Sequence, residues 1–90
     1  MKPQLQVFVA DHCYSCRESR QIAQQIEQAF PDVAVEVIDV DQTPDRVPDS
    51  VFAVPTFVLD NRVVSLGNPS FADISTRLRD ALNTVGDTPA

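Results

Sequence analysis

The spacing of apolar side chains predicts a strand and then a helix in the first third of the chain. Residues 5–10 (LQVFVA) form a short apolar run rich in Val and Phe, which is typical of a buried strand. After the polar segment 11–16, apolar residues recur at helical spacing at Ile22, Ala23, Ile26, Ala29 and Phe30. A residue that precedes proline disfavours the helical conformation, so we expect this helix to end at Phe30, before Pro31.

The following segments predict three more strands. Residues 33–40 (VAVEVIDV) are apolar at most positions, which fits a strand covered on both faces, as in a parallel β-α-β unit. Residues 41–50 contain two prolines and three aspartates, which predicts a loop with at most one helical turn. Two short apolar runs, 57–59 and 63–66, flank a turn at residues 60–62 and predict a tight antiparallel hairpin.

The last predicted helix has two candidate starts. Asn68 is a good N-cap and Pro69 is tolerated in a first turn, whereas Ser70 with Asp73 offers a second cap. Its expected apolar stripe consists of Phe71, Ile74, Leu78, Ala81, Leu82 and Val85, and Gly86 is a natural stop. The order β-α-β and then β-β-α predicts an α/β fold, a four-stranded mixed sheet flanked by helices. We expect a single domain over residues 1–90, with an ordered core at about 4–85.

Charge and composition narrow the classes of partner. The formal net charge is −6 and the pI is near 4.4, which argues against nucleic acid and against an anionic membrane surface. No apolar run approaches the roughly 20 residues of a membrane span, and no secretory signal is recognised at the start. We therefore expect a cytoplasmic protein. In a reducing compartment, paired cysteines indicate redox or metal chemistry more often than a structural bridge.

The two cysteines of the chain, Cys13 and Cys16, lie where the first predicted strand gives way to the first helix. The unpaired N–H groups and positive dipole of a first helical turn stabilise a thiolate, so the pKa of the Cys13 thiol should be lowered. We predict that Cys13 attacks a substrate disulfide and that Cys16 then resolves the mixed disulfide. Zinc is the alternative, but it prefers four ligands, and these cysteines with His12 supply only three.

Three features together resemble the thioredoxin-fold superfamily, and the size resembles its glutaredoxin-like branch. They are Cys13-Tyr14-Ser15-Cys16 after the first strand, Val54-Pro55-Thr56 before the third, and Gly67 after the fourth. The resemblance covers roughly residues 4–85 and implies a thiol–disulfide oxidoreductase. It implies that Pro55 is cis and faces the cysteines, and that the backbone of Val54 pairs with an extended substrate segment. Tyr14, Thr56 and Gly67 would complete the substrate groove.

The resemblance is not to one signature alone. His12 stands where thioredoxins have tryptophan, and Tyr14-Ser15 replaces their Gly-Pro. Gly67 is followed by Asn68-Pro69, where glutaredoxins have a second glycine and an acidic pair that hold glutathione. The electron donor is therefore left between a thioredoxin reductase and glutathione.

Other polar and aromatic residues near the motif are weighed individually. His12 and Arg17 are candidates for tuning the Cys13 thiolate by positive charge, and Arg20 is expected on a solvated face. Phe52 is expected in the core, with a position lining the substrate groove as the alternative. The aspartates of the predicted strand end and loop are interpreted as solvated turn formers rather than metal ligands: Asp39, Asp41, Asp45 and Asp49.

Three hypotheses follow. The first is a disulfide reductase that needs no cofactor beyond a redox-active Cys13–Cys16 disulfide, acts on disulfide-containing proteins or small molecules, and is a monomer. The second is a non-catalytic module that binds zinc or an iron–sulfur cluster through the cysteines of two chains. The third is an interaction domain regulated by the redox state of the pair.

Overall fold

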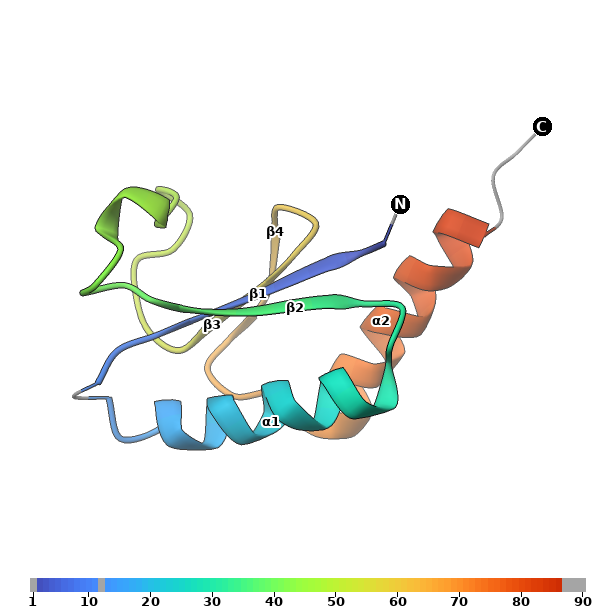
Figure 1. Cartoon of the computed structure of the whole chain (residues 1–90), viewed down its shortest axis with the longest axis horizontal. Coiled ribbons are helices and arrows are strands. Elements are labelled where there is room, and N and C mark those ends of the chain that lie inside the picture. The colour runs from blue at the N-terminus through green and yellow to red at the C-terminus, as the bar shows by residue number, and fades with distance from the viewer. Residues whose placement is uncertain (1, 12, 87–90) are drawn as a thin grey trace.

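The computed structural model describes residues 2–11 and 13–86 and contains strands and helices in the predicted order (Figure 1). The elements are β1 (Gln4–Val9), α1 (Cys16–Ala29), β2 (Ala34–Asp39), the 3₁₀ turn η1 (Pro44–Arg46), β3 (Thr56–Leu59), β4 (Arg62–Leu66) and α2 (Phe71–Gly86). Within the described part of the chain, no helix is long and apolar enough to span a membrane.

The four strands form one mixed sheet in the order β2-β1-β3-β4. β1 is parallel to β2 and antiparallel to β3, and β3 is antiparallel to β4. The β-α-β then β-β-α arrangement predicted from the sequence is therefore confirmed. One pairing matters for the site. Phe8 lies opposite Thr56, so the last residues of β1 and the first residues of β3 lie side by side at the same end of the sheet.

Apolar side chains lie on both faces of the sheet, because successive residues of a strand point to opposite sides. The helices α1 and α2 cover one face and enclose the larger cluster, in which Leu5, Val7 and Val9 of β1 pack with residues of both helices. On the opposite face, Phe8 packs with Ile38, Val58 and Val51 beneath the loop that carries η1 (Figure 1). We call these the helix-side cluster and the loop-side cluster.

The prediction that β2 is covered on both faces is wrong in part. β2 is an edge strand, and its Val37 is exposed. Val35 packs against the helix-side cluster, and Ile38 packs against the loop-side cluster on the opposite face. Each face of β2 is therefore covered only in part. An apolar run shows which residues favour burial, but it does not show that the sheet ends at that strand.

The β3–β4 hairpin turns on two residues with positive φ, Asp60 at 49° and Asn61 at 69°. This conformation matches the twist of a tight hairpin and is tolerated by Asp and Asn. The Asp60 carboxylate also accepts a hydrogen bond of 2.8 Å from the Gln4 amide and so ties the turn to β1. The predicted hairpin is confirmed.

The helix boundaries bring two corrections. α2 begins at Phe71 and is capped by Ser70, whose hydroxyl accepts a 3.1 Å hydrogen bond from the Asp73 amide. Asn68 is therefore not the N-cap, because its side chain binds another helix. In the predicted stripes, Ala29 of α1 and Phe71 of α2 are exposed, since each lies at a helix end beyond the edge of the packed face. The side chain of Val85 lies outside the described residues.

Candidate active site

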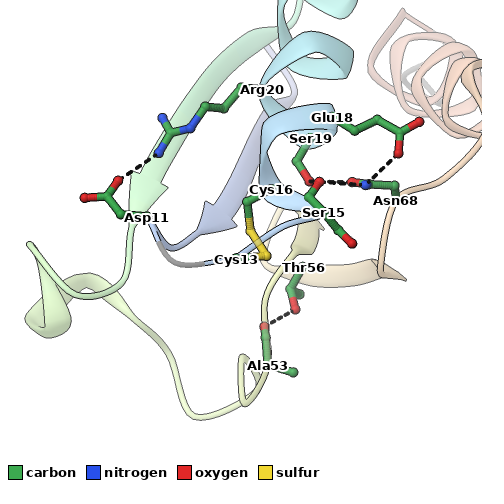
Figure 2. The surroundings of a disulfide bond; sticks show 10 residues. All are labelled: Asp11, Cys13, Ser15, Cys16, Glu18, Ser19, Arg20, Ala53, Thr56 and Asn68. Carbon is green, nitrogen blue, oxygen red and sulfur yellow. Dashed lines mark hydrogen bonds and ion pairs between the residues drawn. A yellow bond between two sulfur atoms is a disulfide. The ribbon is translucent and has the colours of Figure 1, made fainter.

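A disulfide joins Cys13 and Cys16 at the point where the chain leaves β1 and enters α1 (Figure 2). Their Cα atoms are 5.3 Å apart. The Cys13 amide donates to the Ala10 carbonyl at 3.2 Å, and the Cys16 amide donates to the Cys13 carbonyl at 3.3 Å. These two bonds fold the motif into a compact turn that continues the strand into the helix.

The two cysteines differ in their access to solvent. Cys16 is the first residue of α1 and is 1% exposed, as part of the helix-side cluster. Cys13 precedes the helix and is only partly buried at the margin of that cluster. Only the Cys13 side of the disulfide is therefore open to a large reactant.

The segment before β3 lies at the same sheet edge as the cysteines, because Phe8 of β1 pairs with Thr56. The Val54–Pro55 peptide bond is cis, as the resemblance implied. The Thr56 side chain is buried, and its hydroxyl donates a 2.6 Å hydrogen bond to the Ala53 carbonyl (Figure 2). Val54 is partly buried against the helix-side cluster.

Gly67 joins this edge from the end of β4. Its amide donates a 2.8 Å hydrogen bond to the Pro55 carbonyl, and its φ is +92°. That φ lies in the left-handed region that favours glycine. The structure thus brings together Cys13, Cys16, Val54, Pro55 and Gly67 from three separate parts of the sequence.

The charged groups beside Cys13 lie on α1 and on the turn that precedes it. A hollow next to the disulfide is lined by Asp11, Arg17, Glu18 and Arg20 together with Cys13 and Tyr14. Arg20 lies 3.7 Å from Asp11 in an exposed ion pair (Figure 2). Arg17 borders the same hollow, whereas His12, the other tuning candidate, lies outside the described residues. Among residues 2–11 and 13–86, no three His, Cys, Asp or Glu side chains gather as a metal site.

Two aromatic side chains, one in the motif and one in the loop before β3, project into solvent. Tyr14, between the cysteines, is 98% exposed, so it does not pack on the loop that follows Ser50. Phe52, in that loop, is 78% exposed, and the prediction that it belongs to the core is wrong. Its neighbour Val51 fills the loop-side cluster instead. The acidic loop residues behave as predicted at Asp39, whose carboxylate accepts the amides of Asp41 and Gln42 as a turn former.

A polar cluster at the start of α1 was not anticipated from the sequence. Ser19 is fully buried, and its hydroxyl donates a short hydrogen bond to the Asn68 side-chain oxygen (Figure 2). A signal for it exists, because Ser19 lies three residues from both Cys16 and Ile22, on the buried face of α1. A buried hydroxyl needs a partner. Its identity, 49 residues away, depends on the tertiary fold.

Comparisons with known proteins bear on the fold. No protein-family profile matches the chain, and no curated protein matches its sequence. Among solved structures, the oxidised form of mitochondrial thioredoxin 3 from Saccharomyces cerevisiae is 28% identical with a TM-score of 0.73, covering 88% of this chain and 78% of that one. Thioredoxin 1 from the thermophilic eubacterium Thermosipho africanus is 25% identical with a TM-score of 0.74, covering 93% and 99%.

A more distant structure agrees in fold. Thioredoxin f from spinach chloroplast is 19% identical with a TM-score of 0.72, covering 90% of this chain and 71% of that one. These similarities, the mixed sheet and the cysteine pair at the start of α1 support one assignment. This chain is a thioredoxin-fold protein.

Proposed function

We propose that the protein is a thiol–disulfide oxidoreductase that works as a disulfide reductase, with Cys13 as nucleophile and Cys16 as resolving thiol. The observation that carries the proposal is the disulfide itself, which lies at the N-terminus of α1 with one partner accessible and the other buried. A helix N-terminus stabilises a thiolate, and a thiolate is the nucleophile of disulfide exchange. The coarser conclusion, thiol–disulfide chemistry on a thioredoxin-like fold, is supported by the similarity to thioredoxins.

The proposed cycle balances in two steps. In the reduced protein, the Cys13 thiolate attacks one sulfur of the substrate disulfide, which forms a mixed disulfide and releases the other substrate sulfur as a thiol after it takes a proton. The Cys16 thiolate then attacks the Cys13 sulfur, releases the second substrate thiol and leaves the Cys13–Cys16 bond. The substrate gains two electrons and the protein loses two.

The geometry supports different roles for the two sulfur atoms. Cys16 is buried beneath the motif, so a bulky substrate reaches Cys13 first. Cys16 stays close to Cys13 through the amide-to-carbonyl hydrogen bond of the turn, which favours intramolecular attack over a second encounter with substrate. Burial thus shields the Cys16 thiol from direct reaction with substrate until the mixed disulfide has formed at Cys13.

The proposed substrate is an extended segment around a disulfide, bound by the backbone at Val54 and Pro55. The exposed aromatic ring of Tyr14, which lines the hollow next to Cys13, offers apolar contact area there. The electron donor that returns the pair to the dithiol is a thioredoxin reductase or glutathione. We place this cycle in a reducing cytoplasm.

The proposal is tested by reduction of insulin disulfides with two donor systems in parallel, NADPH with thioredoxin reductase and glutathione with glutathione reductase. We expect turnover with at least one donor, none with Cys13→Ser, and trapped mixed disulfides with Cys16→Ser. Thr76→Ala, on an exposed position of α2, is the control and should keep full activity. Activity that neither cysteine substitution changes would refute the proposal. A protein that is inactive with both donors and carries zinc or a cluster would support the metal-binding alternative.

A further inference from the structure

The side chain of Asn68 connects the loop after β4 to the first turn of α1. Its amide nitrogen donates to the Ser15 carbonyl at 2.9 Å and to the Glu18 carboxylate at 3.2 Å. Its amide oxygen accepts the hydrogen bond of the buried Ser19 hydroxyl. Figure 2 shows these contacts on the side of α1 that faces away from Asp11 and Arg20. One side chain therefore holds the N-cap residue and two residues of the first turn of α1.

The loop that carries Asn68 is itself held in place. The preceding residue, Gly67, donates its amide to the Pro55 carbonyl at 2.8 Å. The Ser65 hydroxyl donates a 2.8 Å hydrogen bond to the Gly67 carbonyl, but this contact lies within the loop and reaches neither Pro55 nor α1. Asn68 thus connects the Pro55 segment to α1, because the residue before it is hydrogen-bonded to Pro55 and its own side chain is hydrogen-bonded to the start of the helix.

The contact with Ser15 reaches the cysteine motif directly. The Ser15 carbonyl and the Cys16 amide N–H belong to the same peptide unit, and that N–H donates a 3.3 Å hydrogen bond to the Cys13 carbonyl oxygen, which holds the turn of the motif. A hydrogen bond received by the carbonyl polarises the peptide and strengthens its N–H as a donor. Ser15, the N-cap of α1, makes no side-chain capping hydrogen bond, so its own side chain does not compete for the N–H groups of the first turn.

The charges around Cys13 make the contact with Glu18 relevant as well. Asp11 is paired with Arg20, Arg17 borders the hollow, and the facing segment 51–55 (VFAVP) carries no charge. Glu18 also borders the hollow, but its carboxylate is drawn toward Asn68 in Figure 2, away from the disulfide. A carboxylate released toward Cys13 would oppose a thiolate there.

From these contacts we propose that Asn68 is a positioning residue that fixes the first turn of α1 and thereby stabilises the Cys13 thiolate. The proposal rests on the proposed function, since it concerns the nucleophile of the same site. Asn68 acts through Ser15, Ser19 and Glu18 and does not need to touch the substrate. Loss of its side chain should loosen the peptide before Cys16 and release Glu18, and both changes disfavour the thiolate.

The test is the pH dependence of Cys13 alkylation by iodoacetamide, measured in a Cys16→Ser background so that a single thiol reports. Only the thiolate reacts, so the midpoint of the rate profile is the thiol pKa. We expect Asn68→Ala to raise this midpoint by about half to one pH unit, as helix-terminus effects of this kind do. Ser19→Ala should shift it in the same direction by less. Ser65→Ala, which removes a hydrogen bond of the same loop that does not reach α1, is the matched control and should leave it unchanged.

An unchanged midpoint in a folded Asn68→Ala variant would overturn the proposal. Where circular dichroism shows that Asn68→Ala is unfolded, Ser19→Ala decides in the same way. An equal shift in Ser65→Ala would also refute it, because the effect would then be general loosening of the loop. The assay contains no disulfide substrate. A wild-type protein that is inactive in disulfide reduction would thus refute the proposed function, while the shift in the alkylation midpoint would still support the role of Asn68.

Discussion

Reduction of the Cys13–Cys16 disulfide removes a cross-link between residues only three positions apart. The reduced protein should remain folded, because the helix-side cluster is assembled from β1, α1, β3 and α2 without help from this bond. Cys16 stays in that cluster as a small apolar side chain whether or not it is bonded. A reductase has to be folded in both redox states, so this prediction tests a requirement of the proposed cycle.

The loss of folding stability on reduction follows from the short loop that the disulfide closes. The chain-entropy relation gives a stabilisation of about 2 kcal/mol for so short a loop. Stabilisation of the Cys13 thiolate in the folded, reduced protein works against this loss, so about 2 kcal/mol is an upper limit at neutral pH. A small protein with a urea m-value of about 1 kcal/mol per M should therefore lose at most about 2 M in its unfolding midpoint.

The assay is urea unfolding followed by circular dichroism, with and without dithiothreitol. Cys13→Ser cannot form the bond and should give the same midpoint under both conditions. A reduced protein that is unfolded without urea, or a loss far above 2 M, would refute the reasoning. The pair would then be a structural staple, and redox cycling at this site would be excluded.

Three further predictions concern the framework of the site. Phe57→Ala, at a fully buried position, should lower the free energy of unfolding by about 3–5 kcal/mol. Phe52→Ala, at an exposed position, should change it by less than about 0.5 kcal/mol. Equal losses for the two variants in urea unfolding would contradict the assigned burial. Gly67→Ala should lose about 1–2 kcal/mol from its positive φ alone, because an added Cβ meets no atom within 4 Å, and unchanged thermal stability would argue against this conformation. The hydrogen bond from Arg46 lowers the pKa of Glu36. The wild-type protein should therefore have a larger free energy of unfolding than Glu36→Gln above the ordinary pKa of the carboxyl, and this difference should disappear as pH falls through the lowered pKa. A difference that persists in acid would exclude this cause.

The elements of the fold were predictable from the sequence because local rules determine them. The apolar run that contains Val7 and Phe8, the helical spacing of Ile22 and Ile26, and the turn residues at Asp60-Asn61 all act within a few positions of the chain. The predictions that were wrong concern burial, which depends on neighbours far away in the sequence. Phe52 belongs by composition to a core, but Val51 occupies the available space in the loop-side cluster. Burial is a property of the packed sheet, and hydropathy alone does not decide which of two adjacent residues obtains it.

The candidate site divides in the same way. Cys13 and Cys16 were recognised because their spacing and their place at a strand–helix junction are local, and the cis bond at Pro55 was reached only through resemblance. Local criteria could not decide between Asn68 and Ser70 as the cap of α2, since an asparagine before a proline fits an N-cap as well as a serine does.

The fold gives the capping role to Ser70 and leaves the Asn68 amide free to bind the helix that carries the cysteines. One of the two residues that the sequence offered for the start of α2 thus serves the start of α1. This exchange links the Pro55 segment, the Gly67 turn and the Cys13 nucleophile into one hydrogen-bonded unit. Loss of the Asn68 side chain, which joins the three, is therefore expected to raise the pKa of the Cys13 thiol.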